Sequence, residues 1–177
     1  MNCLESENIR LRALEPEDVD VMYRWENDVS VWRVSNTTAP YSKYMLREFV
    51  ENQRHDVFET KQLRLMICTR ATGRPVGAVD LFDVDPYNRR AGVGILIYET
   101  QDKRHGYASE ALALMILYAF QTLILNQLYC NITAGNIASM SLFRNKGFTM
   151  VGLKKEWIKT TADWQDEYML QLINPKR

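Results

Sequence analysis

Residues 98–111 read YETQDKRHGYASEA, and they are the most informative stretch of the chain. An apolar, strand-like run ends here, a basic loop with one glycine follows, and an apolar helix begins at about Ala108. A helix that starts directly after such a loop offers free backbone N–H groups, and its aligned peptide dipoles favour an anion there. Lys103, Arg104 and His105 add positive charge at the same place. The stretch therefore predicts a phosphate or pyrophosphate site, with a capped helix beside a solvated basic loop as the alternative.

Two common nucleotide motifs are missing from this stretch. It lacks the Gly-Lys-Ser/Thr ending of a Walker loop, and it lacks the three glycines of a dinucleotide fingerprint. Nucleotide hydrolysis and hydride transfer are therefore disfavoured as activities.

Length and composition indicate one domain over residues 1–177. The chain has 46% hydrophobic residues, and its 22 Lys+Arg balance its 22 Asp+Glu to give a net charge of zero. This is enough apolar sequence for one core. A neutral chain without a basic run lacks the long-range attraction of a nucleic-acid or anionic-membrane binder. We therefore expect neither nucleic acid nor a membrane as a partner.

The N-terminus and the cysteines favour a reduced, cytoplasmic protein. The first residues carry acids early and do not resemble a secretory signal. Cys3, Cys68 and Cys130 are odd in number and far apart, and neither they nor His55 and His105 have the short spacing of metal ligands. We therefore expect no metal site, and we expect Cys68 and Cys130 to be buried, inert thiols.

The pattern of apolar residues predicts a mixture of strands and helices. Strands are expected at residues 9–14, 63–69, 76–84, 89–98 and 127–133, with a final hairpin over 150–159 and 165–173. Helices are expected after residues 15–18, after Ser42, from about Ala108, and over 136–146 with Asn136 as N-cap and Gly147 as the left-handed stop. Val31 to Tyr41 is expected to be a loop. The uncharged stretch from Ala111 to Phe143 is interrupted by polar residues and predicts a buried helix and strand rather than a membrane span.

A second informative segment, residues 136–148, reads NIASMSLFRNKGF. Together with the loop at 103–108, it resembles the GCN5-related N-acetyltransferase superfamily, whose pyrophosphate loop begins with Gln or Arg where this chain has Lys103. The resemblance extends to residues 88–91 and 163–166, and it is to the branch that includes ribosomal-protein N-terminal and spermidine acetyltransferases. It covers about residues 8 to 173.

The resemblance implies a mixed α/β fold, in which a mostly antiparallel sheet with one parallel, splayed strand pair is flanked by helices. Acetyl-CoA is the implied co-substrate, lying between the strands at 92–98 and 128–133. The residues implied to contact it are Ile95, Leu96, Ile97, Tyr98, Lys103, Arg104, His105, Gly106, Tyr107, Ala108, Ser109, Asn136, Ser139 and Phe143. Gly92 and Gly94 are expected to ease a bulge or the close approach of a ligand.

The implied activity is transfer of acetyl from acetyl-CoA to a primary amine of a small molecule, a polyamine or a peptide N-terminus, by direct attack. Ser139 and Asp80 are the implied catalytic residues: Ser139 would protonate the leaving thiolate, and Asp80 would bind or deprotonate the amine. The alternatives are capping or pantetheine contact for Ser139 and an outward-facing strand position for Asp80. Phe143 stands where many relatives have a tyrosine acid, and Gly92 where the branch often has glutamate. A noncatalytic acyl-CoA-binding regulatory module is therefore the alternative.

The acceptor and the assembly state are left open by the sequence. The segment at 34–41 lacks the acids with which polyamine-binding relatives neutralise a polycation, although Asp28, Asp80, Asp163 and Asp166 could converge in space. The four tryptophans are expected to serve core or hairpin packing. The sequence is compatible with a monomer and with a homo-oligomer.

Overall fold

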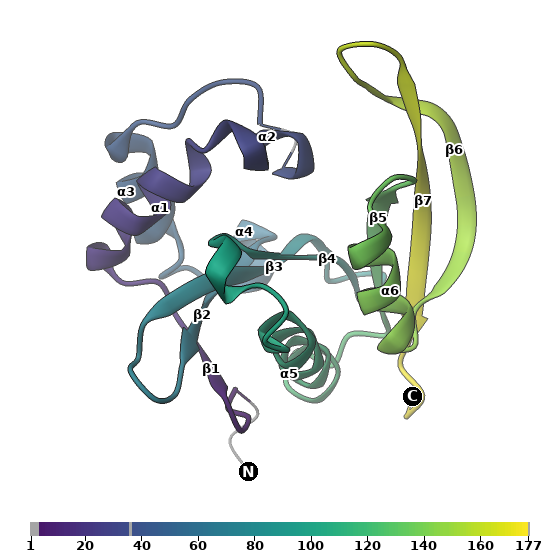
Figure 1. Ribbon diagram of the computed structural model, residues 1–177. Helices are drawn as coiled ribbons and strands as arrows, with labels where there is room; N and C mark the ends of the chain where they lie inside the picture. The colour runs from purple at the N-terminus through teal and green to yellow at the C-terminus, as the bar shows by residue number, and fades with distance from the viewer. Residues whose placement is uncertain (1–3, 36, 177) are drawn as a thin grey trace.

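The computed structural model describes residues 4–35 and 37–176, so Cys3 and Asn36 lie outside the described residues. Seven strands form one sheet in the order β1-β2-β3-β4-β5-β7-β6 (Figure 1). The strands are β1 (Ile9–Arg12), β2 (Leu63–Thr69), β3 (Pro75–Asp85), β4 (Arg90–Ile97), β5 (Gln127–Thr133), β6 (Thr149–Lys159) and β7 (Trp164–Ile173). The helices are η1 (Pro16–Asp18), α1 (Val19–Glu26), α2 (Val29–Ser35), α3 (Lys43–Asn52), α4 (Val57–Thr60), η2 (Thr100–Asp102), α5 (Tyr107–Gln121) and α6 (Ile137–Asn145).

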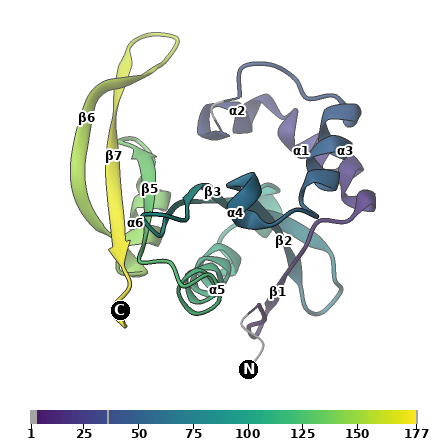
Figure 2. The same ribbon diagram turned by 180° about the vertical axis from the view of Figure 1, so that it is seen from behind.

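The sheet has the mixed topology that the resemblance implies. Strands β4 and β5 run parallel, with α5 as the crossover between them, and every other neighbouring pair is antiparallel. Figures 1 and 2 show α1, α2 and α3 together on one side of the first strands, α5 on the other side, and α6 beside β5. The expected fold class is confirmed.

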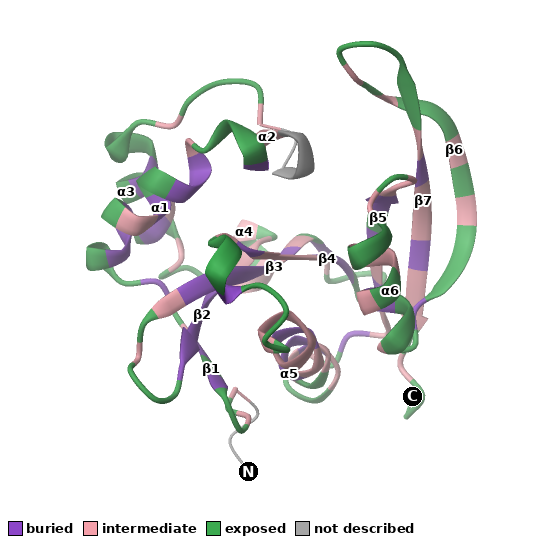
Figure 3. Ribbon diagram, in the orientation of Figure 1, coloured by how far each residue is buried: buried purple, intermediate pink, exposed green. Residues whose placement is uncertain are grey.

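Two apolar clusters hold the helices against the sheet. The larger one lies between α5, α6 and the strands, where Leu112 and Met115 of α5 are fully buried. The smaller one joins α1 and α3 to the opposite face of β2 through Met22, Leu46 and Met66. Both clusters follow from side chains that alternate along the strands and recur on one face of each helix. At the edge of the sheet, β6 is mostly exposed (Figure 3).

The helix signals predicted around α6 are confirmed. The Asn136 side chain accepts a hydrogen bond from the N–H of Ser139 at 3.1 Å, as an N-cap does. Gly147 has a φ of +90°, the left-handed conformation expected after the helix. Among the described residues, no helix combines the length and the apolar character needed to cross a bilayer.

The loop expected from Val31 to Tyr41 is wrong in its first part, because α2 occupies Val29–Ser35. The Asp28 carboxylate accepts from the Ser30 N–H at 2.9 Å and starts this helix. Val31 is buried, and the Trp32 indole N–H donates to the backbone carbonyl of Glu26 at 2.9 Å. Tertiary contacts thus outweigh the weak helix propensity of this β-branched segment.

Candidate active site

The site begins where the parallel strand pair separates. Strands β4 and β5 pair at Arg90–Gln127, Ala91–Leu128 and Gly92–Tyr129, and their pairing stops there. Strand β4 continues to Ile97 and β5 to Thr133, so the two strands splay as expected. A splayed strand leaves backbone amides facing a gap, where a ligand can pair with them. A cleft of about 670 Å³ opens at this point.

Several predicted residues meet in this cleft. Those that line it are Asp80, Ile95, Leu96, Tyr98, Asn136, Ser139 and Phe143. Ile97 packs in the large core instead, with 8% of its surface exposed. The N–H of Tyr98 already donates to the carbonyl of Val76 at 3.3 Å, so its side chain rather than its amide faces the cleft. The structure thus gathers strand and helix residues that lie about 60 positions apart in the chain.

The remaining predicted residues form the start of α5. Lys103, Arg104, His105 and Gly106 are exposed, while Tyr107, Ala108 and Ser109 form the first, half-buried helical positions. Arg104 and Gly106 have φ values of +66° and +83°, and Gly106 is an N-cap without a capping side chain. The first N–H groups of a helix have no acceptor within it. This end of the fifteen-residue helix therefore fits a diphosphate, as acetyl-CoA requires.

An ion pair fixes the turn that leads into this loop. Asp102 is 4% exposed, and its two carboxylate oxygens accept from the Arg74 guanidinium at 2.6 and 2.8 Å. The hydrogen bonds from Arg74 hold the pKa of the Asp102 carboxyl below its usual value, against a smaller opposing effect of burial. A second contact, from His105 Nε2 to the carbonyl of Gln101 at 3.0 Å, closes the turn.

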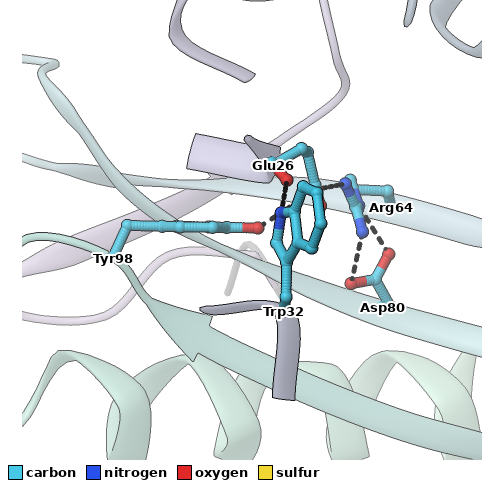
Figure 4. A network of polar contacts seen from close by, with 5 residues as sticks. All are labelled: Glu26, Trp32, Arg64, Asp80 and Tyr98. Atoms are coloured by element: carbon cyan, nitrogen blue, oxygen red, sulfur yellow. Dashed lines mark hydrogen bonds and ion pairs between the residues drawn. The ribbon is translucent and has the colours of Figure 1, made fainter. Parts of the chain in front are cut away.

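A charged network forms one wall of the cleft (Figure 4). Arg64 Nη1 donates to Glu26 Oε1 at 2.5 Å, and Arg64 Nε donates to Asp80 Oδ1 at 2.7 Å. The Tyr98 hydroxyl donates to the same Glu26 oxygen at 3.2 Å. The Trp32 indole, which donates to the backbone carbonyl of Glu26, fixes the end of α1 that carries this carboxylate. We call Glu26, Arg64, Asp80 and Tyr98 the acidic network.

The acidic network places a perturbed carboxylate in the cleft. Burial raises the pKa of Asp80 and the Glu26 charge raises it further, whereas Arg64 opposes both. The side chain of Asp80 is nevertheless 19% exposed, so it can reach a ligand. A carboxylate with a raised pKa is a better proton acceptor than an ordinary aspartate.

A second charged group forms the opposite wall. Lys154 of β6 pairs with the buried Glu167 of β7, donates to Asn131 Oδ1 at 3.1 Å, and lies 4.9 Å from the centre of the Trp157 ring. A bulge in β6 between Lys154 and Ile158 brings Trp157 to the rim, where it is 58% exposed. Trp157 thus packs on Lys154 within the hairpin, as expected, and it also lines the cleft.

Gly94 and Phe82 form the floor between these walls, and Gly92 lies two residues before Gly94 on β4. A Cβ on Gly92 would lie 2.2 Å from the Phe82 ring, so this glycine admits Phe82 rather than a ligand. A Cβ on Gly94 would meet only Phe82, at an ordinary 3.7 Å, so Gly94 leaves space above the floor. The nearby irregularity lies on β3, where Asp83 has a φ of +49°, and not at either glycine.

Of the four aspartates whose convergence the sequence left open, only Asp80 lines the cleft. Asp28 starts α2, and Asp163 and Asp166 lie in the β6–β7 hairpin, so none of these three lines the cleft. The lining carboxylates that the sequence analysis missed are Glu26 and Glu167. Glu26 could have been found, because it shares a helical face with Val19 and Met22 at spacings of seven and four. The residues that enter the cleft from β6 and β7 had no such local signal.

The two described cysteines are buried thiols, as expected from the sequence. Cys68 and Cys130 are buried and free, and burial raises the pKa of Cys130 to about 12. A thiol with such a pKa is protonated and unreactive at neutral pH. Among the described residues, no group of three His, Cys, Asp or Glu side chains could hold a metal ion.

Comparison with known proteins also identifies acetyltransferases as relatives of this chain. The acetyltransferase (GNAT) domain family matches residues 8–149. An uncharacterized N-acetyltransferase, p20, from Bacillus licheniformis is 27% identical over 173 residues, which cover 98% of this chain and 97% of the relative. The spermidine N(1)-acetyltransferase of Escherichia coli is 29% identical over 147 residues, which cover 82% of this chain and 75% of the relative.

Solved structures share the fold. The crystal structure of spermidine N-acetyltransferase from Vibrio cholerae in complex with CoA and spermine superposes with a TM-score of 0.84. The identity is 21%, and the match covers 93% of this chain and 95% of that one.

Proposed function

This chain belongs to the acetyltransferase (GNAT) family and is an acetyl-CoA-dependent N-acetyltransferase, and we propose that its acceptor is a primary amine bound beside Asp80. The acceptor classes compatible with the site are a small amine, a polyamine and a peptide N-terminus. One observation supports this proposal above the others: the gap between the splayed strands and the acidic network open into the same cleft.

The first requirement of the reaction is a neutral amine. An ammonium group is attracted by the surplus negative charge of the acidic network and must lose a proton before it can attack. Asp80 accepts that proton in this proposal, directly or through one water molecule, because its carboxylate has a raised pKa and partial access to the cleft.

The second requirement is stabilisation at the reacting carbonyl and at the leaving group. When bound, acetyl-CoA supplies a thioester whose carbonyl carbon the amine attacks. Backbone N–H groups of β4 beyond Gly92, where the parallel pairing has ended, are the proposed donors to the carbonyl oxygen. Ser139 lines the cleft near the start of α6 and is the proposed proton donor to the thiolate, since Phe143 carries no acidic proton.

The experiment is a measurement of CoA thiol release by the purified protein with acetyl-CoA and a panel of amines, amino acids and peptides. We expect release above the hydrolysis background with at least one primary amine, and a strong loss of turnover in Asp80→Asn with retained CoA binding. Tight CoA binding without turnover over the whole panel would overturn the proposal and would favour the noncatalytic module.

A further inference from the structure

The charges of the cleft are nearly balanced. Among the described lining residues, the carboxylates are Glu26, Asp80 and Glu167, and the cations are Arg64 and Lys154. Three carboxylates against two cations leave a surplus of one negative charge. An acceptor with one ammonium group satisfies this surplus, and a second ammonium group finds no further unpaired charge.

Both cations are held in place by their partners. Arg64 is 18% exposed and bridges Glu26 and Asp80, which raise its pKa despite its burial. Lys154 is 30% exposed and is paired with Glu167, which is 7% exposed. Neither cation can move into bulk solvent without leaving a shielded carboxylate unpaired, which is costly. Both positive charges therefore remain in the cleft when an acceptor enters.

Part of the lining between the charged walls is apolar, beside the polar side chains of Gln62, Asn131, Thr133, Asn136 and Ser139. Phe82 and Gly94 form the floor of the cleft, Leu96 and Phe143 line it near the splayed strands, and Trp157 stands at the rim. Burial of apolar surface against these groups stabilises a bound hydrocarbon chain or ring by about 25 cal/mol per Å². The additional charged nitrogens of a polyamine would contact these apolar residues without a charged partner, so they would not gain this stabilisation.

We infer that the acceptor carries a single ammonium group on an apolar chain or ring, and that the cleft selects against polyamines. This inference rests on the proposed function and narrows it to one class of amine. It contrasts with the named activity of the spermidine N(1)-acetyltransferase relative, which shares 29% identity.

The reaction of such a monoamine balances in this cleft. The amine nitrogen forms a bond to the acetyl carbon as the carbon–sulfur bond breaks. The ammonium group gives up two protons in total. One ends on the sulfur of CoA, and the other leaves through Asp80 to solvent. The products are the neutral N-acetylamine and CoA with a free thiol.

The test compares two amines with the same six-carbon chain, hexylamine and 1,6-diaminohexane, of which the second carries one more primary amino group and therefore one more positive charge. The wild-type protein is assayed for CoA release at saturating acetyl-CoA. We expect kcat/KM to be about tenfold higher for hexylamine, since the first ammonium group neutralises the cleft and the second would lose water without finding an unpaired carboxylate. An equal or higher kcat/KM for the diamine would overturn the inference while leaving the proposed function intact. Absence of turnover with these amines and with the whole panel would overturn both.

A charge variant supplies the matched control. Lys154→Met raises the surplus to two negative charges, whereas Lys154→Met/Glu167→Gln returns it to one. We expect the single variant to raise the ratio of diamine to monoamine kcat/KM about fivefold, with all proteins compared at the same pH. The double variant should return the ratio toward the wild-type value. An unchanged ratio in a single variant that still binds CoA would contradict the charge argument, and the wild-type comparison remains decisive if the variants fail to fold.

Discussion

Replacing Gly92 with alanine tests the packing of Phe82, which lines the cleft, against β4. The new Cβ would lie 2.2 Å from Phe82 Cε2, 2.5 Å from Cζ and 2.7 Å from Cδ2. Carbon atoms in contact normally lie about 3.5–4.0 Å apart. The Phe82 ring must therefore turn, although its edge packs on the Tyr129 ring with centroids 6.0 Å apart.

The expected cost follows from overpacking. Forcing a methyl group into a filled site costs about 1–3 kcal/mol. For a domain of this length, about 2 kcal/mol lowers Tm by about 4–8 °C. Gly94→Ala is the matched control on the same strand and face, because its Cβ meets Phe82 at 3.7 Å. We expect its Tm to stay at or slightly above the wild-type value, since alanine restricts the unfolded chain.

The assay is thermal and urea unfolding followed by circular dichroism, with Phe82→Ala completing a double-mutant cycle. Once the ring is removed, Gly92→Ala should cost almost nothing, so the coupling energy should be about 2 kcal/mol. A Gly92→Ala protein as stable as wild type would refute the reasoning. Equal costs of Gly92→Ala with and without the ring would refute it as well.

Three further predictions concern the site. Gly106→Val forces a β-branched residue to a φ of +83°, so we expect it to distort the loop and to weaken CoA binding at least about tenfold, as measured by calorimetry. The control is Gly152→Val, because Gly152 lies at an open strand position. For Asp80, burial raises the pKa above the ordinary 3.8 against the pull of its paired guanidinium, so kcat/KM should fall as pH drops through that raised value. This acid limb should vanish in Asp80→Asn, and an unchanged pH profile would remove its role as base. Asp102→Asn should raise KM for acetyl-CoA without changing KM for the amine, because Arg74 no longer fixes the turn. Since the Asp102 pKa is lowered in the folded state, the ion pair stabilises above about pH 4, and the Tm gap between wild type and variant should close as pH falls below that value.

Local signals predicted α6 and the loop before α5, the two elements proposed to bind acetyl-CoA. Asn136 and Gly147 mark the ends of α6, because capping depends on a few adjacent residues. The loop before α5 was predicted for the same reason. By contrast, α2 was missed, since its stability comes from Trp32 and Val31 packing against distant residues.

The acceptor side could not be predicted in the same way. Asp80 faces Arg64 because β2 and β3 pair in one register, and a shift by one residue would point both side chains to the opposite face. Trp157 reaches the cleft through a bulge in β6 that follows Lys154, where three residues of β6 lie opposite one of β7. Strand register and bulges depend on pairing between distant segments, so composition and periodicity do not fix them.

Two residues that are common in the family, a glutamate and a tyrosine acid, are replaced here by Gly92 and Phe143, and both replacements involve a packed aromatic ring. Phe82 fills the space beside Gly92, so glutamate at position 92 would have to displace an aromatic ring that packs on Tyr129. Phe143 is 4% exposed and packs at right angles to Phe148, with the ring centres 5.0 Å apart. At both positions an apolar ring therefore borders the floor of the cleft. Asp80 of β3 is one of the three carboxylates that line the cleft, and the apolar rings at these two positions offer surface that a hydrocarbon-bearing amine would bury.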